Sequence, residues 1–358
     1  MLDTVNLEAP LLSIQQIDEL QHAVKIIFGE NDVKHHLIMK GKKCSQNQAV
    51  WSTAGFFSMG ILEFSIKQIF YPNGISVIAK FKPSLLLDKG QSKTALSNMK
   101  DYANAVNSFD DFIKTINSHL HSFQLPQAIY WNVNRVDYAL QYSTPFYEPL
   151  LYILNKGDAM ADNLGYKTSA YYVNTCRNIN IYDKTEQQNL SAVDGEHLIR
   201  FEVQCKRKAL KHMAEKYHWE RISIYHVWDE RIAKKTVINA VKMLIGEHDF
   251  FNLDTAETIV RSNFNAKKAD NILSFLKKTR YNKAKLKNLL SGMMEGYSPD
   301  YIRRSIRPAL NKVGIAPVLV PDCYHISILE NPIAQLQQPY ICQCNEQQDY
   351  YIPLNRFP

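Results

Sequence analysis

The spacing of hydrophobic residues changes along the chain and predicts an α+β fold. Apolar and polar residues alternate, as in half-buried strands, at residues 74–82, 128–140, 171–184 and 198–205. Apolar residues recur every three or four positions, as in amphipathic helices, at residues 96–123, 146–154, 206–217 and 286–294. We therefore expect a central antiparallel or mixed β-sheet flanked by helices, followed by a basic, mainly helical region after residue 205.

Proline and serine positions mark where some of these elements end or begin. Pro83 should end the strand at 74–82, because proline has no N–H to donate to the ladder. Ser298 and Pro299 should open a later helix, with the serine as its cap. That helix should end or kink just before Pro308.

Three of the predicted strands collect polar side chains on one face. Residues two apart on a strand point the same way, so each strand can carry a polar pair opposite an apolar face. The pairs are Arg135 with Asp137, Tyr182 with Lys184, and Arg200 with Glu202. If the strands are neighbours, one sheet face gathers two carboxylates, a tyrosine, a lysine and two arginines.

This combination of side chains is suited to phosphoryl transfer. Asp137 and Glu202 offer the hard oxygen ligands that Mg²⁺ or Mn²⁺ prefers. The Tyr182 phenol would act as the nucleophile, and Arg135 and Arg200 would hold either phosphate oxygens or the carboxylates. Taken singly, each pair is also typical of a surface ion pair or a packing tyrosine, so the hypothesis depends on all three strands.

Composition narrows the class of protein. The chain has 358 residues, of which 46% are hydrophobic and 22% charged, as in soluble globular proteins with two or three domains. No run approaches the roughly 18 uncharged apolar residues of a membrane-spanning helix, and residues 1–3 lack the basic residues of a secretory signal. The six cysteines lack CxxC pairs and indicate reduced thiols in a cytoplasm.

Basic residues are concentrated in the second half of the chain. Residues 204–310 hold 22 Lys and Arg against 11 Asp and Glu, whereas the remainder holds 20 against 24. Such a field attracts nucleic acid, although a solvated lysine-rich helix face gives the same pattern. The candidate DNA contacts are Lys206, Arg207, Lys277, Lys278, Arg280, Arg303, Arg304 and Arg307.

Several short segments also match a known pattern, in order along most of the chain. They are Met1–Val5, the strand at 76–87 with its Lys-Pro-Ser-Leu continuation, Asn134–Asp137, Tyr182–Glu186, Leu198–Val203, Glu295–Ser298 and Val313–Ile315. At these segments the chain resembles the gene II/X family of phage and plasmid replication initiators, the nicking enzymes of filamentous phages. It is more distantly similar to the tyrosine-dependent initiators of rolling-circle plasmids.

The resemblance implies a specific activity and its residues. The enzyme would nick one strand of double-stranded origin DNA, form a 5′-phosphotyrosine, prime synthesis from the 3′ hydroxyl and rejoin the displaced single strand. The implied nucleophile is Tyr182, with Tyr171 and Tyr172 as rivals, and the implied metal ligands are Asp137, Glu202 and, third, Glu186. Catalysis would also involve Lys184, Arg200 and Arg135. A host helicase and polymerase in the cytoplasm of a bacterial cell would be its partners, and a homodimer is an open alternative.

Two other patterns are weaker candidates for a site. His119 and His121 lie two apart in a predicted helix, where their side chains diverge by about 200° and cannot share one metal. Cys342 and Cys344 lack a second ligand pair for zinc. Since no GxxxxGK[ST] motif is present, DNA unwinding would fall to the host helicase.

We expect a catalytic domain at residues 1–205, a basic helical DNA-binding region at 206–325 and a C-terminal tail at 326–358. The leading hypothesis is a metal-dependent DNA nickase and strand transferase that initiates rolling-circle replication. The alternative is a non-enzymatic DNA-binding repressor or partition protein, in which the polar strands are only a surface.

Overall fold

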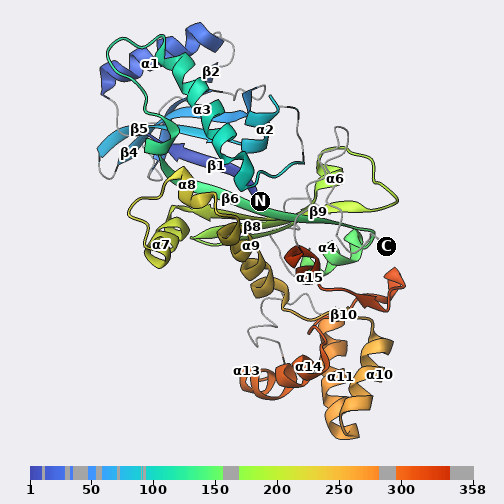
Figure 1. Cartoon of the computed structure of the whole chain (residues 1–358). Helices are drawn as coiled ribbons and strands as arrows, with labels where there is room; N and C mark the ends of the chain where they lie inside the picture. The colour runs from blue at the N-terminus through green and yellow to red at the C-terminus, as the bar shows by residue number, and fades with distance from the viewer. Residues whose placement is uncertain are drawn as a thin grey trace. The chain divides into compact units, whose positions relative to one another are not determined.

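A computed structural model of the chain describes residues 1–9, 13–28, 33–34, 47–53, 59–70, 73–89, 91, 94–155, 169–281 and 296–338 (Figure 1). The chain forms two compact units. The first unit holds residues 1–139, 174–177 and 204–234, and the second holds 140–173, 178–203 and 235–358. These bounds follow spatial packing and are discontinuous, so the functional boundary near residue 205 stays a prediction.

The first unit is built on an antiparallel sheet with the strand order β2-β3-β4-β5-β1-β6. Its strands are β1 (Leu2–Glu8), β2 (Val33–Lys34), β3 (Asn47–Thr53), β4 (Ile61–Phe70), β5 (Asn73–Phe81) and β6 (Asn132–Thr144), whose C-terminal half belongs to the second unit. The predicted strand at 74–82 is β5, and Pro83 ends it by opening the short helix α2 (Pro83–Leu87).

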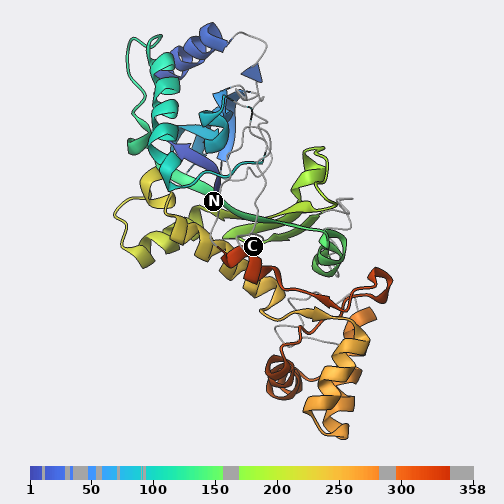
Figure 2. The same cartoon turned by 45° about the vertical axis from the view of Figure 1, so that its right-hand side comes forward.

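Helices cover this sheet and close the core of the first unit. They are α1 (Ile14–Phe28), α2, α3 (Tyr102–Asn117), α7 (Arg207–Tyr217) and α8 (Ile224–Val227), with the 3-10 turns η3 (Met99–Asp101) and η4 (Ala128–Tyr130). Figure 2 shows α1 and α3 on one side of the strands. Phe109 and Phe112 of α3 pack on Phe81 and Phe64, with ring centroids 5.1 and 5.7 Å apart.

Helix α3 starts later than the periodicity predicts. The apolar spacing begins at residue 96, but the side chain of Asn98 accepts a hydrogen bond from the N–H of Lys100, and Asp101 accepts from the N–H of Asn98. This capping box holds Asn98 in extended backbone, so regular helix begins only after it.

The second unit contains strands in the order β6-β9-β8-β7. They are β7 (Ser169–Val173), β8 (Arg177–Asp183) and β9 (His197–Lys206), and β7 pairs antiparallel with β8, with Tyr171 opposite Asn180. The single strand predicted at 171–184 is therefore wrong: it is a hairpin. Asn174 breaks it, because its side-chain oxygen accepts from the N–H groups of Cys176 and Arg177.

Helices form the rest of the second unit. They are α4 (Tyr147–Asn155), α6 (Lys184–Gln187), most of α9 (Glu230–Ile245), α10 (Leu253–Asn263), α11 (Ala266–Tyr281), α13 (Pro299–Tyr301), α14 (Arg307–Val313) and α15 (Pro332–Gln337), with the paired short strands β10 (Phe250–Phe251) and β11 (Ile328–Leu329). The protein is thus α+β, with a basic helical region after its sheet, as predicted.

The helix opened by Ser298 confirms one prediction and refines another. The Ser298 hydroxyl accepts from the N–H of Tyr301 at 3.1 Å, as an N-cap should. The helical path does not stop before Pro308. It passes through a π-helical segment at Ile302–Ile306 and continues as α14, which has Pro308 in its first turn. A proline is tolerated there because the first turn of a helix does not need its N–H. The helix predicted at 286–294 lies outside the described residues.

Within the described ranges, we find no helix that combines the length and the apolar character needed to cross a lipid bilayer.

A buried thiol and a buried phenol in the first unit should make its stability fall at alkaline pH. Burial raises the pKa of the Cys205 thiol to about 12 and lifts the pKa of the Tyr138 hydroxyl, which donates to the Val227 carbonyl oxygen, well above its ordinary value. Above about pH 9 the unfolded chain loses these protons while the folded state keeps them, so the free energy of unfolding should fall as pH rises. Urea unfolding midpoints at pH 8 and pH 10.5 measure this.

The control for this expectation is Cys205→Ala, which removes one of the two groups. Its midpoint should fall less between the two pH values than that of the wild type. An equal fall of the urea midpoint between pH 8 and pH 10.5 in both proteins would contradict a raised thiol pKa in the folded state.

Candidate active site

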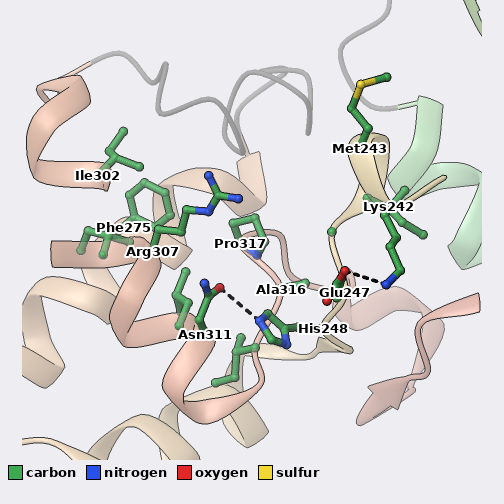
Figure 3. A pocket seen from close by; sticks show the side chains of 15 residues that line it. Lys242, Met243, Glu247, His248, Phe275, Ile302, Arg307, Asn311, Ala316 and Pro317 are labelled. Carbon is green, nitrogen blue, oxygen red and sulfur yellow. Dashed lines mark hydrogen bonds and ion pairs between the residues drawn. The ribbon is translucent and has the colours of Figure 1, made fainter. Parts of the chain in front are cut away.

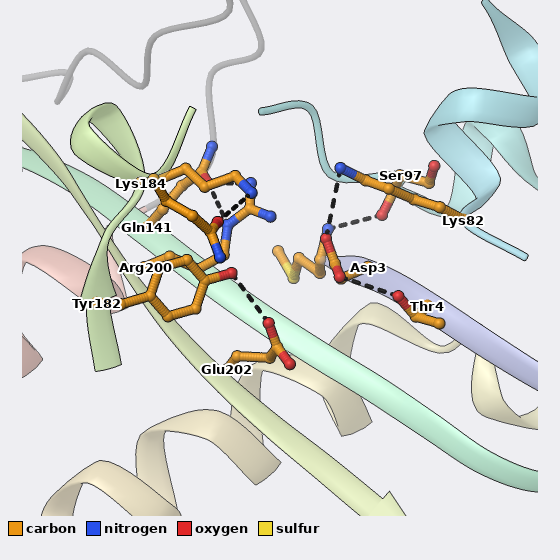
Figure 4. A network of polar contacts seen from close by, with 11 residues as sticks. Asp3, Thr4, Lys82, Ser97, Gln141, Tyr182, Lys184, Arg200 and Glu202 are labelled. Atoms are coloured by element: carbon orange, nitrogen blue, oxygen red, sulfur yellow. Dashed lines mark hydrogen bonds and ion pairs between the residues drawn. The ribbon is translucent and has the colours of Figure 1, made fainter. Parts of the chain in front are cut away.

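Tyr182 and Glu202 meet on neighbouring strands of the second unit. The Tyr182 hydroxyl donates to Glu202 Oε2 at 3.1 Å, and Figure 4 shows the two side chains pointing toward each other. Asn180, two residues before the tyrosine on β8, donates its Nδ2–H to Glu202 Oε1 at 3.4 Å. Two of the side chains that the alternation predicts on one polar face are therefore in contact.

The local sequence explains why these side chains share a face. Along β8, Ile179 and Ile181 are buried, while Asn180 and Tyr182 are half-buried on the opposite side. On β9, Glu202 follows the same alternation but is only 7% exposed. The carboxylate thus lies in a largely water-excluded place, where hydrogen bonds to a negative charge are stronger than in water.

This pair has the geometry of a nucleophile and its proton acceptor. An oxygen–oxygen distance of 3.1 Å is within the reach required for proton transfer from a hydroxyl to a general base. A carboxylate is a much weaker base than a phenolate, so the phenolate needs additional positive charge nearby. Lys184 supplies such a charge, since its Nζ lies 5.7 Å from the centroid of the Tyr182 ring.

Lys184 reaches this position from a helix and not from the strand. Strand β8 ends at Asp183, whose side chain caps α6 by accepting from the N–H of Glu186 at 3.1 Å. Lys184 is therefore the first residue of α6, which corrects its predicted place beside Tyr182 on the strand. Its side chain is buried, and Nζ donates to Gln187 Oε1 at 2.8 Å.

The capping residue Asp183 forms a cluster with His197 and Tyr147 that the strand pattern does not predict. Its buried carboxylate lies 2.5 Å from His197 Nδ1 at the start of β9, and the His197 ring stacks on Tyr147 with centroids 3.7 Å apart. The cluster ties the end of β8 to the start of β9. The Asp-x-x-Glu spacing, typical of a helix N-terminus, was the available signal.

Arg200 lies below the surface of the site. It is fully buried, and its Nε and Nη2 donate to Gln141 Oε1 on β6 at 2.9 and 2.6 Å. A guanidinium with no exposed surface cannot reach a phosphate in this arrangement. Of the two roles expected for Arg200, a contact with phosphate does not fit this burial, and its bonds to Gln141 hold β9 against the second-unit half of β6, which is a positioning role.

Arg135 and Asp137 form a pair of their own in the first unit. Arg135 donates through Nε and Nη2 to the two oxygens of Asp137 at 2.8 and 2.7 Å, a bidentate arrangement. Asp137 is buried, whereas the Arg135 side chain is about one-third exposed. Of the two roles expected for Arg135, holding a carboxylate is the one this geometry fits.

The predicted metal ligands do not form one set. Among the described residues, no three His, Cys, Asp or Glu side chains are gathered so that they could hold a metal ion. Both Asp137 oxygens accept from Arg135, and Glu186 is exposed on α6. Beside Glu202, the side-chain oxygen Oδ1 of Asn180 is buried and has no hydrogen-bond partner.

Two protein oxygens are enough for Mg²⁺ at a phosphoryl-transfer site. The ion often keeps several waters and takes one or two protein oxygens together with a substrate phosphate. The Asn180 Nδ2 faces Glu202 Oε1 in this structure, so the amide would have to turn its Oδ1 toward Glu202 for the two residues to hold Mg²⁺ or Mn²⁺. Asn180 lies two residues before Tyr182 on β8, so the alternation of the strand places both side chains on this face.

The basic residues expected to contact DNA are mostly at the surface. In the first unit, Lys206 donates to the Asn174 carbonyl oxygen at 2.9 Å, and Arg207 lies 3.9 Å from Glu8 while remaining well exposed. Phosphate contacts can replace or join such weak exposed pairs at low cost.

The second unit carries the other expected DNA contacts. Those that are exposed are Lys277, Lys278, Arg303, Arg304 and Arg307. Lys278 Nζ lies over the ring of Tyr297, 5.0 Å from its centroid, and Arg303 pairs with Asp300 at 3.0 Å. The side chain of Arg280 lies outside the described part of the structure.

A cavity of about 460 Å³ lies among α9, α11 and α14 (Figure 3). Its walls are largely apolar and include Phe275. The polar groups at its rim engage one another, because Lys242 pairs with Glu247 at 2.8 Å and His248 Nε2 lies 3.1 Å from Asn311 Oδ1. These contacts are an ion pair and an imidazole–amide contact, whereas on the face that carries Tyr182 a hydroxyl donates to a buried carboxylate.

The histidine and cysteine patterns give no competing site in the described residues. His119 and His121 lie just after α3 ends at Asn117, in a turn at the surface, and belong to no metal-binding group there. Cys342 and Cys344 lie outside the described residues.

No protein-family model matches this sequence, and no curated protein matches it.

Proposed function

We propose that the protein is a DNA nickase and strand transferase that initiates rolling-circle replication, with Tyr182 as its nucleophile. The observation that carries this proposal is the 3.1 Å hydrogen bond from the Tyr182 hydroxyl to the buried Glu202 carboxylate. The resemblance of the polar strands to the gene II/X initiators supports it. A tyrosine that is merely packed needs neither a buried carboxylate on its hydroxyl nor a lysine at its ring.

The proposed first transfer proceeds by exchange of one ester bond for another. The Tyr182 oxygen attacks the phosphorus of an origin phosphodiester while its proton moves to Glu202 Oε2. The P–O3′ bond breaks, the 3′ oxygen takes a proton from solvent, and the 5′ phosphate remains on the tyrosine. Because an ester bond is conserved, a free 3′ hydroxyl can reverse the reaction and rejoin the displaced strand.

The surrounding residues support this step through charge and position. Lys184 stabilises negative charge on the phenolate oxygen, and Arg200 keeps Glu202 in place through β9. A Mg²⁺ or Mn²⁺ ion held by Glu202 and Asn180 would withdraw charge from the scissile phosphate. The exposed basic residues of both units would bind the DNA backbone, and a host helicase and polymerase would extend the nicked strand.

Incubation with supercoiled plasmids that carry candidate origins, with Mg²⁺, tests the proposal. The wild-type protein should convert supercoiled to open circles and leave a protein on the 5′ end that survives denaturation. EDTA should abolish both products, and added Mn²⁺ or Mg²⁺ should restore them. Binding of the same origins without nicking or adduct in either metal would favour the repressor or partition protein.

A further inference from the structure

Four aromatic side chains form a continuous cluster at the surface of the first unit. They run from the last residue of α7 into α8 and are Tyr217, Trp219, Tyr225 and His226, called here the aromatic platform. Tyr217 stacks on Trp219 with centroids 5.7 Å apart, and Trp219 stacks on His226 at 5.0 Å. The ring planes differ by only 24° and 17°, so the three rings face the same way.

The stacked rings of the platform overlap only in part, so some of their surface is not covered by another ring. Separations of 5.0 and 5.7 Å indicate rings displaced sideways, so each covers only part of the next. Tyr225, which meets His226 edge to face, is 58% exposed. Tyr130 on η4, a turn that contacts α8, is 57% exposed. Tyr217, Trp219 and His226 are half-buried, so the exposed aromatic surface consists of Tyr225, Tyr130 and the uncovered parts of this stack. Exposed apolar surface gathered in one place is typical of an interaction site.

The platform is anchored in the core and is therefore preorganised. Tyr225 contacts Tyr102 edge to face, and Tyr102 contacts the buried Trp228 in the same way, with centroids 5.7 and 5.4 Å apart. The indole N–H of Trp228 donates to the Asn98 carbonyl oxygen at 2.7 Å. The Ser223 hydroxyl lies 2.9 Å from His226 Nδ1. Rings held this way lose little freedom when a ligand binds.

Positive charge lies next to the rings. Residues 206–221 contain six Lys and Arg against two Glu. Helix α7 exposes Arg207, Lys208, Lys211 and Lys216, and Lys216 Nζ lies 5.5 Å from the centroid of the Tyr217 ring. Arg221 is exposed beside the platform and hydrogen-bonds the Ile129 carbonyl oxygen. A ligand that suits this surface has flat apolar rings and regularly spaced negative charges.

We propose that the aromatic platform and the cations of α7 bind single-stranded DNA. Unpaired bases expose the flat faces that aromatic side chains stack on, whereas a duplex hides them, and the phosphates between bases suit the lysines. That the bound strand is the displaced origin strand rests on the proposed function. The binding itself needs no cleavage.

Titration of the full-length protein with fluorescein-labelled oligo(dT) 20-mer tests this inference. We expect binding that quenches tryptophan fluorescence, with the quenching reduced in Trp219→Ala, since Trp219 is partly exposed in the platform. Tyr225→Ala should weaken binding roughly tenfold, because stacking of one base is lost, while Tyr225→Phe keeps the ring and should bind as the wild type. The double variant Lys208→Glu, Lys211→Glu should weaken binding and reduce its salt dependence.

Matched controls keep this inference separate from the proposed function. Tyr152→Ala removes an exposed tyrosine elsewhere, 45% exposed on α4, and should leave binding unchanged. Unchanged affinity in both Tyr225→Ala and Trp219→Ala would overturn the proposal, as would equal competition by duplex or tighter binding of oligo(U). A wild type that binds oligo(dT) through the platform but never nicks would refute the proposed function alone.

Discussion

Tyr182→Phe should abolish nicking of supercoiled origin DNA, with a loss of roughly 10⁴-fold or more, because phenylalanine has no oxygen to attack the phosphorus. The covalent adduct should disappear with it. The ring keeps its place, and the fold loses the hydrogen bond to the buried Glu202 carboxylate, worth about 1.5–3 kcal/mol. Open-circle formation and a denaturation-resistant protein–DNA band measure the effect, and origin binding by gel shift should remain.

The two rival tyrosines on β7 are the matched controls. The Tyr172 hydroxyl donates to the Leu154 carbonyl oxygen at 2.6 Å, and the Tyr171 hydroxyl oxygen accepts from Asn178 at 2.9 Å. Replacing either tyrosine removes these bonds but leaves the Tyr182–Glu202 hydrogen bond in place, so Tyr171→Phe and Tyr172→Phe should nick at nearly the wild-type rate. Residual nicking in Tyr182→Phe together with loss in either control would transfer the nucleophile's role to β7.

Arg200→Ala should destabilise the second unit by about 3 kcal/mol or more. The substitution empties the space of a fully buried side chain and leaves Gln141 without the donors at 2.9 and 2.6 Å. The measurement is the urea unfolding transition followed by circular dichroism. Arg304→Ala, at an exposed position of the π-helical segment, should change stability by less than about 0.5 kcal/mol.

Arg200→Met separates the positioning role from a contact with phosphate, one of the two roles that the sequence predicts for Arg200. Methionine fills most of the volume without a charge, so this variant should be more stable than Arg200→Ala. If Arg200 acts by holding β9, nicking should decline in step with the loss of stability across the two variants. An Arg200→Met protein as stable as the wild type but unable to nick would instead favour a direct contact with DNA.

Local periodicity correctly predicts which face of a strand a side chain occupies and where some helices and strands begin or end. The alternation along β8 and β9 put Asn180, Tyr182 and Glu202 on one face, and the structure has them in hydrogen-bond contact. The Ser298 cap and the predicted strand at β5 were equally local. A side chain's face on a strand and its place at a helix end follow from neighbouring residues, so a single chain read in order contains them.

The burial of these side chains and the partners that they contact depend on packing between segments far apart in the sequence. The pattern of β9 gave Arg200 and Glu202 the same polar face, yet Arg200 is buried against Gln141, which lies 59 residues earlier in the chain on the neighbouring strand β6. The tie between Asp183 and His197 and the gathering of rings around Trp219 also join elements far apart in sequence. Periodicity fixes the direction of a side chain, but burial and partnership depend on what packs opposite, which the order of residues does not contain.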